Sequence, residues 1–502
     1  MSPLVALQTA PLPAVMGPRI GAIALLYGAV VVAIAIWASR RTRSAKDFFV
    51  AGSGIGIWTL AIAAMASTLS GFAFIGGPGL MYTLGMGAMF IILPASLTNT
   101  MAAWTLAKRM RLLGEVRGLI TVPDAIGARY RSRAAQGLAG VAILVAIVGY
   151  MATNVLALGL VVDAVFGTGL SAGIWIGTSV VLAYSAAGGM LAGVYTDLFQ
   201  GVVMALASVL VFGFALASGG GLAGISRTIL AADPAFLAPW GKLTPLAALS
   251  FFFVFGLGAL GQPHVIHKFY MLRDPLRLKW YPALMTGALL LTLLLYFGVG
   301  LAVKAEVAGG GLAPLLRADD ATPQFVLRYT PVVLAGIVFS GVAAAIMSTV
   351  NSFMNIGAAV VTHDLPVAFR RRLSNELLWG RLSTVAISLV AALVAQFSGT
   401  LVAFLGIFGW GLFASTLVPA LAIGLNWPGA TRAGALASIV TGLAVTLGFE
   451  TAAYFRFYSF PAGITVSGLS LVLSLLVFFG VSWLTRTQAA EVDADVRLIM
   501  ET

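Results

Sequence analysis

The sequence predicts an all-α integral membrane protein, and three observations carry that prediction. Hydrophobic residues make up 60% of the 502 residues and charged residues only 9%, whereas a typical soluble protein is about a quarter charged. The chain divides into about thirteen apolar runs, each long enough to cross a bilayer as a helix. Its basic residues gather in alternate loops between these runs. A soluble enzyme and a disordered chain are both excluded.

The predicted spans lie near residues 20–39, 53–78, 85–107, 136–162, 170–188, 195–218, 245–264, 280–303, 332–361, 381–398, 400–424, 433–454 and 462–485. The first run differs from a cleaved signal peptide, whose positive charges precede its apolar core. Here only Arg19 precedes the core, whereas Arg40, Arg41, Arg43 and Lys46 follow it. Because cytoplasmic loops carry an excess of Lys and Arg, we expect the N-terminus outside.

Alternation of thirteen spans then places 22 of the 29 basic residues inside and seven outside. One missing or extra helix would reverse every later loop and destroy this bias. We therefore expect a cytoplasmic C-terminus and a multi-pass protein of the cell (inner) membrane. The net charge of +12 is a topology signal, because a nucleic-acid partner would require a basic face interleaved with aromatic residues. We expect the protein to lie in the lipid bilayer and to require no obligatory protein partner.

Two of the predicted spans contain clusters of small, polar and helix-breaking residues. Residues 62–79 read IAAMASTLSGFAFIGGPG, and residues 251–269 read FFFVFGLGALGQPHVIHKF. Gly weakens a helix and Pro removes a backbone donor, so both segments are expected to free backbone carbonyls inside the membrane. Secondary transporters bind their substrates at such interruptions.

These two spans are the second and the seventh, five apart. If spans 2–6 and 7–11 are repeats, their odd number of helices gives them opposite orientations, and each interruption lies in the first helix of its repeat. The expected organisation is an N-terminal span and loop (1–52), one repeat (53–218), a second repeat with its preceding outer loop (219–424), and two last spans with a short tail (425–502).

Five motifs occur in order along the chain: DFFVAGSGIG (47–56), SGFAFIGGPG (70–79), GGMLAGVYTDLFQ (188–200), GLGALGQPHVIHKFYM (256–271) and AAAIMSTVNS (343–352). The third is similar to the signature GG-x-x-A-V-x-W-T-D-x-x-Q. Together they resemble the sodium:solute symporter family of sodium/proline, sodium/pantothenate and sodium/glucose transporters, from about residue 47 to 425. The resemblance implies a LeuT-like 5+5 inverted-repeat fold and Na⁺ as the coupled ion.

A sodium site can be reasoned from the residues and from the resemblance. Ala345, Ser348 and Thr349 share one helical face through their i, i+3, i+4 spacing. Their hydroxyl and carbonyl oxygens suit a hard cation, and the resemblance adds the carbonyls of Ala66 and Leu69. The alternative is that both hydroxyls only bond to their own helix backbone.

The acidic residue of YTDLFQ, Asp197, is implied by the same resemblance to line the inward exit path of the ion. A charged residue at membrane depth is a functional hypothesis by default. A helix-capping aspartate at the membrane boundary is the alternative of equal weight.

Candidate solute contacts are Ser70, Phe72, Asn154, Phe255, Gln262 and Asn351. Each has a structural alternative, which is core packing for the phenylalanines and interhelical hydrogen bonding for the asparagines.

Thr68 and Ser53 replace an Asp and an Arg of the proline-transporter pattern, so proline specificity stays open. The sugar branch fits less well, because its S-A-E-Q-F run is S-T-L-S-G-F here. Phe72 and Phe255 predict an apolar pocket without an indole donor, and His264 is expected near the cytoplasmic end.

The leading hypothesis is a sodium-coupled symporter that imports an amino acid, a monocarboxylate or a pantothenate-like acid by alternating access. A proton-coupled transporter of the same fold is the nearest alternative, although proton relays need intramembrane acids that are scarce here. A membrane-embedded enzyme is disfavoured, because the spans contain no HExxH or Ser/His/Asp grouping and the chain has three His and no Cys. A channel is disfavoured by the inverted pair of interruptions.

Overall fold

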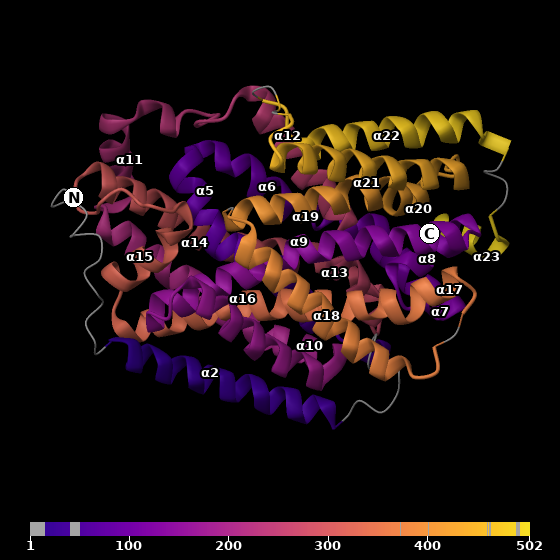
Figure 1. Ribbon diagram of the computed structural model, residues 1–502, viewed down its shortest axis with the longest axis horizontal. Helices are drawn as coiled ribbons and strands as arrows, with labels where there is room; N and C mark the ends of the chain where they lie inside the picture. The colour runs from indigo at the N-terminus through magenta and orange to yellow at the C-terminus, as the bar shows by residue number, and fades with distance from the viewer. Residues whose placement is uncertain are drawn as a thin grey trace.

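The structure, a computed structural model, describes residues 16–40, 51–371, 373–399, 401–458, 460, 463–487 and 492–502. Over these ranges the protein is a helical bundle whose long helices lie alongside one another (Figure 1). Eleven helices of the described residues are long and apolar enough to cross a membrane, so the chain is a multi-pass membrane protein. The basic residues Arg41, Arg43 and Lys46 of the first predicted loop lie outside the described ranges.

The first half of the bundle contains α2 (Met16–Ser39), η2 (Ala51–Ser53), α4 (Ile57–Thr68), η3 (Phe72–Gly76), α5 (Gly77–Leu84), η4 (Gly85–Ala88), α6 (Met89–Thr98), η5 (Ala103–Ala107), α7 (Lys108–Arg117), α8 (Val122–Tyr130), α9 (Arg133–Phe166), α10 (Leu170–Ser218), α11 (Gly221–Ala232) and η6 (Pro234–Leu237). The second half begins with α12 (Pro245–Gly258), η7 (Ala259–Gly261), α13 (Pro263–Ile266), η8 (His267–Met271), η9 (Pro275–Trp280), α14 (Tyr281–Ala308), η10 (Ala318–Asp320) and α15 (Ala321–Tyr329). It continues with α16 (Val332–Ala359), η11 (Val360–Asp364), α17 (Leu365–Ala368), α18 (Glu376–Phe397), α19 (Val402–Leu417), η12 (Val418–Ile423), α20 (Gly424–Asn426), α21 (Arg432–Tyr454), α22 (Val466–Leu484) and α23 (Ala494–Met500).

Two predicted spans, 170–188 and 195–218, fall within α10. The first part of α10 follows α9 through a turn of three residues, in which Gly167 and Gly169 have positive φ, and it packs back along α9. Further on, Tyr195 contacts Trp37 and Phe199 contacts Tyr27, so the second part runs antiparallel to α2.

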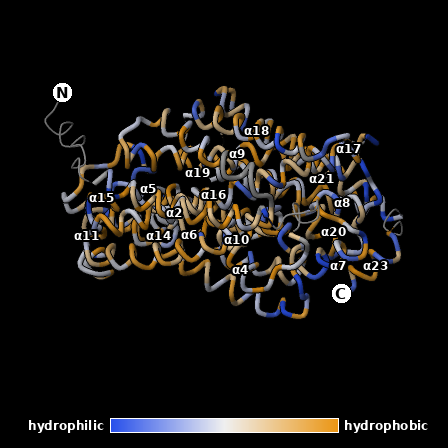
Figure 2. Tube along the Cα trace, turned by 90° about the horizontal axis from the view of Figure 1, so that it is seen from below, coloured by the Kyte–Doolittle hydropathy of each residue, from blue (hydrophilic) through white to orange (hydrophobic). Residues whose placement is uncertain are grey.

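One end of the bundle is hydrophilic and carries α7, α8, α23 and the C-terminus, as Figure 2 shows. Arg117 at the end of α7 forms ion pairs with Asp493 and Asp495, at 2.7 and 2.6 Å. The hydrogen bond from Arg117 lowers the pKa of Asp495 to about 2. These contacts hold the C-terminal helix α23 against α7 at this end.

The opposite end is covered by η10 and α15. The Thr322 hydroxyl of α15 donates a hydrogen bond of 2.7 Å to the Phe74 carbonyl in η3. The backbone N–H of Val402, the first residue of α19, donates one of 2.8 Å to a carboxylate oxygen of Asp319. This segment therefore ties η3 to the start of α19.

Asp319→Asn is expected to stabilise the protein at pH 7.5 and to have little effect at pH 4.5. Burial raises the pKa of Asp319 to about 6, so the folded protein binds a proton that the unfolded chain has lost above its ordinary pKa of about 4. Stability therefore falls as pH rises from about 4 through 6, by up to about 3 kcal/mol in total. Asparagine keeps the acceptor for Val402 without the buried charge. Thermal unfolding in detergent at both pH values measures the difference.

Asp320→Asn is the matched control, because the neighbouring Asp320 pairs with Arg317 in a more exposed setting. It should give no such gain at pH 7.5. An equal shift for Asp319→Asn at both pH values would contradict the assignment of the effect to its buried charge.

Candidate functional site

The second predicted span is interrupted where its small residues cluster. The helix α4 ends at Thr68, and Leu69 has extended backbone with φ −87° and ψ 100°. The chain then continues through the π-helical turn η3, which begins at Phe72. The last carbonyls of a helix have no partner within it, and that turn of α4 includes Ala66. The predicted interruption is confirmed.

The five predicted sodium ligands are all buried and come from two elements, the end of α4 and the middle of α16: Ala66, Leu69, Ala345, Ser348 and Thr349. Thr349 Oγ1 lies 3.0 Å from the carbonyl oxygen of Ser67, and 3.0 Å from that of Ala345. Ser348 Oγ lies 3.2 Å from Ser67 Oγ. The structure thus brings the α16 hydroxyls against the interrupted end of α4.

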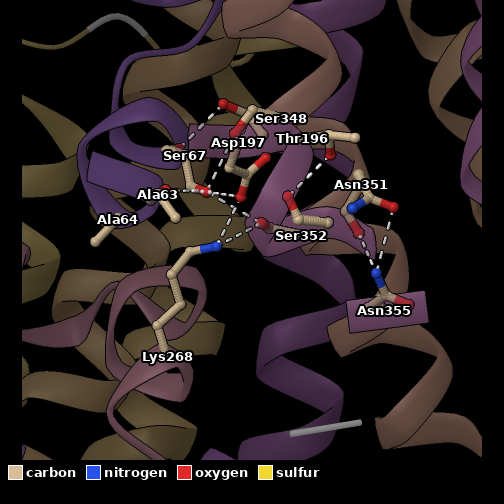
Figure 3. A network of polar contacts seen from close by, with 12 residues as sticks. Ala63, Ala64, Ser67, Thr196, Asp197, Lys268, Ser348, Asn351, Ser352 and Asn355 are labelled. Atoms are coloured by element: carbon tan, nitrogen blue, oxygen red, sulfur yellow. Dashed lines mark hydrogen bonds and ion pairs between the residues drawn. The ribbon is translucent and has the colours of Figure 1, made fainter. Parts of the chain in front are cut away.

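Asp197 of α10 lies next to these groups and forms a buried ion pair with Lys268 (Figure 3). The distance from Lys268 Nζ to Asp197 Oδ2 is 2.9 Å, and each side chain is 1% exposed. The same carboxylate oxygen lies 3.1 Å from Ser67 Oγ. The Ser352 hydroxyl completes the group, at 3.2 Å from Ser67 Oγ and 3.5 Å from Lys268 Nζ.

The predicted spans 245–264 and 280–303 leave Lys268 in the loop between them, among the basic residues counted as inside, and its burial corrects that placement. The chain remains inside the bundle after α13, because η8 packs against α4, and this position directs Lys268 inward. Asp197 is likewise fully buried, and it lies within α10 instead of capping the start of a helix. The signal was present in the sequence, since charges at membrane depth are usually paired and the apolar residues on both sides of Lys268 marked it as a partner for Asp197.

The seventh predicted span is interrupted in a similar way. The helix α12 ends at Gly258, Gln262 is extended with φ −77° and ψ 104°, and α13 starts at Pro263. This second predicted interruption is confirmed as well.

A parallel β-bridge joins the two interrupted segments. It pairs Ile55, which lies just before α4, with Leu272, which lies just after η8. The Ile55 N–H donates to the Met271 carbonyl at 3.0 Å, and the Arg273 N–H donates to the Ile55 carbonyl at 2.9 Å. The start of α4 and the end of η8 are therefore held together by backbone hydrogen bonds.

Aromatic side chains fill the space between the two interruptions. Phe72 stacks on Phe255 with ring centroids 5.9 Å apart, and Phe255 stacks on Trp410 of α19 at 5.2 Å. Ser70 Oγ lies 3.3 Å from the hydroxyl of Tyr150 on α9. Trp410 supplies the indole that the sequence interpretation lacked, because it comes from a span far along the chain that carries no motif.

Polar atoms without partners lie in the same region. The Gln262 amide donates to the Gly258 carbonyl at 2.9 Å, while its buried oxygen has no hydrogen-bond partner among the described residues. Both ring nitrogens of His264 are buried and equally unpartnered within those residues. The His264 ring lies 4.7 Å from that of Phe353 and 6.2 Å from that of Tyr150, so this histidine belongs to the aromatic cluster and not to the cytoplasmic end.

The two candidate asparagines both hydrogen-bond within the protein. Asn154 Oδ1 accepts a hydrogen bond of 2.9 Å from the Gly71 N–H, and so satisfies a backbone donor at the first interruption. Asn351 hydrogen-bonds with Asn355 and lies against Gly193 of α10, where an added Cβ would meet its amide at 2.5 Å. The structure brings Ser70, Phe72 and Phe255 together. It places Gln262 at the second interruption and Asn351 against α10.

Two interrupted helices that enclose buried polar groups within an apolar bundle define a class of protein, the membrane transporters with broken helices. Comparison with known proteins identifies the family. Residues 48–442 match the sodium:solute symporter family. The chain belongs to this family, which consists of transporters and not of enzymes.

Relatives match over nearly their whole length. The high-affinity proline transporter PutP of Bacillus subtilis is 29% identical over 476 residues, which are 91% of this chain and 97% of the relative. The sodium/pantothenate symporter of Escherichia coli is 28% identical over 465 residues, which are 90% and 94% of the two chains. Among solved structures, a sodium-coupled sialic acid symporter in its substrate-bound outward-open state superposes with a TM-score of 0.78 at 17% identity, covering 93% of this chain and 97% of that one. The fold is therefore shared with that transporter.

Proposed function

We propose that the protein imports a small organic solute together with Na⁺, and that the ion binds between the end of α4 and α16. The main support is the approach of Thr349 Oγ1 to the Ser67 carbonyl, at 3.0 Å. It places two α16 hydroxyls beside the carbonyls of an interrupted helix. Hydroxyl and carbonyl oxygens are the ligands that hard cations take. Ala66, Leu69 and Ala345 would contribute carbonyls, and Ser348 and Thr349 hydroxyls.

The proposed topology has thirteen spans and a LeuT-like 5+5 inverted repeat. Besides the eleven long apolar helices, α4 with its continuation and the first part of α10 would provide the two further crossings. The similar backbone of Leu69 and Gln262, with ψ of 100° and 104°, supports equivalent roles for the two interrupted spans. The distribution of basic residues supports an outer N-terminus and a cytoplasmic C-terminus.

In this proposal Na⁺ stabilises one conformation of the protein by bridging α4 to α16. An ion can shift a conformational equilibrium only by its difference in affinity for the two states. The solute would bind beside Phe72, Phe255 and Trp410, and would complete the contacts between the interruptions. Movement of the bundle then releases ion and solute to the cytoplasm, with Asp197 beside the exit path.

The solute is proposed to be an amino acid, a monocarboxylate or a pantothenate-like acid. The relatives carry proline and pantothenate in their names. The aromatic cluster offers an apolar surface with a few polar atoms, and pockets for small molecules combine such surfaces. A thermal-shift screen of these solutes with and without sodium would identify the substrate, because a ligand that binds the folded protein raises the melting temperature of that protein.

Sodium should drive uptake where protons do not. Purified protein in proteoliposomes is expected to accumulate the identified solute above equilibrium with an inward sodium gradient and no pH gradient. A pH gradient in choline buffer should give only equilibration. Accumulation under the pH gradient alone would instead favour the proton-coupled alternative.

Gln262→Leu is expected to raise the KM for the solute by about 10-fold. The substitution removes a buried amide oxygen that has no partner among the described residues and that would bond to the solute. The loss of one such hydrogen bond costs about 0.5–1.5 kcal/mol of binding free energy. Sodium binding to the protein without solute should stay unchanged. Gln200→Leu is the matched control, since Gln200 is also buried with an unpartnered oxygen in the described structure but contacts Tyr27. A larger KM change for Gln200→Leu than for Gln262→Leu would contradict the assignment.

A further inference from the structure

A cluster of oxygen atoms lies at the ammonium group of Lys268 in the interior of the bundle (Figure 3). It consists of the Asp197 carboxylate and the hydroxyls of Ser67, Ser348 and Ser352. Ser67 Oγ is its centre and lies 3.1–3.2 Å from the carboxylate and from each of the other two hydroxyls. The lysine reaches two members of the cluster, Asp197 at 2.9 Å and Ser352 at 3.5 Å.

Such a donor set is the kind that binds a hard cation. A carboxylate with several hydroxyl oxygens suits Na⁺ by charge and by ligand type. Asp197 is also only partly satisfied, because its Oδ1 atom is buried and has no hydrogen-bond partner in the described part of the chain. A metal ion would find one carboxylate oxygen free and three hydroxyls close together.

The buried carboxylate requires a positive charge nearby. Removing one partner of a buried ion pair leaves an uncompensated charge and strongly destabilises the fold. In this protein the compensating charge is covalently attached, because Lys268 extends into the cluster from η8. The ammonium therefore stands where a free cation would otherwise be needed.

This cluster borders directly on the proposed sodium site. Ser348 belongs to both groups, and Ser67 contributes its hydroxyl to the cluster and its carbonyl to the contact with Thr349. Lys268 reaches Asp197 and Ser352, which are the members of the cluster outside the proposed sodium site. A cation bound to those two groups would lie against the ammonium, and like charges in contact repel strongly in a buried environment.

We propose that Lys268 is a built-in cation that fills a second cation site, so that the protein binds one Na⁺ where the same oxygen cluster without the lysine would bind a second. The inference rests on the proposed function, since the first ion is the one assigned to Ser348 and Thr349. It assigns to Lys268 a role in setting the number of ions coupled to each solute.

The number of bound sodium ions tests the proposal. Purified protein in detergent is equilibrated with ²²Na⁺ at saturating concentration, and bound ions are counted per protein molecule. Wild type and Lys268→Arg, which keeps the charge, should bind one ion each. Lys268→Met should bind two, and Lys268→Met combined with Asp197→Asn should return to one.

The outcomes separate the two proposals. If wild type binds one ion and Lys268→Met also binds one, the role of Lys268 is overturned while the sodium site stands. If wild type binds none and Lys268→Met binds one, the role of Lys268 as a built-in cation is supported and the sodium site at Ser348 and Thr349 is refuted. No binding by either protein overturns both.

If Lys268→Met stays folded in sodium but not in choline, Na⁺ replaces the ammonium as proposed, whereas unfolding in both buffers overturns the replacement.

Discussion

Replacing both Ser348 and Thr349 with alanine is expected to abolish sodium-stimulated uptake while the protein still inserts into the membrane. The two hydroxyls face the interrupted end of α4, where Thr349 Oγ1 lies 3.0 Å from the Ser67 carbonyl. A hydrogen bond to a charged group contributes about 1.5–3 kcal/mol. We take the loss of both hydroxyl ligands to weaken the free energy of sodium binding by a similar amount. The sodium concentration for half-maximal uptake should therefore rise at least about 100-fold. Uptake in proteoliposomes over a range of sodium concentrations measures this change.

Ser340→Ala is the matched control for this experiment. Ser340 lies on the same helix α16 and is buried, but its hydroxyl has no hydrogen-bond partner among the residues described. The control should transport like the wild type. Undiminished sodium-dependent uptake by the double variant would remove the basis of the proposed ion site.

The second large effect is expected on stability. In choline buffer, Lys268→Met should lower the free energy of unfolding by about 3–5 kcal/mol, because it leaves the Asp197 carboxylate buried without its counter-charge. Adding Asp197→Asn should recover most of this loss, since the neutral pair no longer needs compensation. A double-mutant cycle from chemical unfolding in detergent gives the interaction energy directly.

The exposed pair of Lys242 and Asp233 provides the comparison. Its N···O distance of 2.7 Å is similar, but its side chains are 42% and 23% exposed. Such surface pairs contribute little to stability, so Lys242→Met should have a small effect. An equally small effect for Lys268→Met would contradict the view that the buried pair is strongly coupled.

Local chemistry made part of this architecture predictable. Clusters of small and helix-breaking residues marked two spans as interrupted, and the breaks at Leu69 and Gln262 lie within these segments. The i, i+3, i+4 spacing likewise placed Ser348 and Thr349 on one face of α16. Both features depend on residues close together in the sequence.

Contacts between distant segments were not predictable in the same way. Trp410 reaches the aromatic cluster only because α19 packs beside α12, and no spacing along the chain encodes that approach. Lys268 was missed because the charged loop begins only five positions later, at Arg273, and a hydropathy window blurs the end of a span. Its partner Asp197 is 71 positions earlier in the chain, and only the folded bundle joins them.

The β-bridge between Ile55 and Leu272 has a mechanical consequence. Moving the start of α4 past the end of η8 would break two backbone hydrogen bonds at once, those of 3.0 and 2.9 Å made by Ile55. A displacement of one interrupted segment at this end is therefore transmitted to the other through the backbone, without any side chain between them.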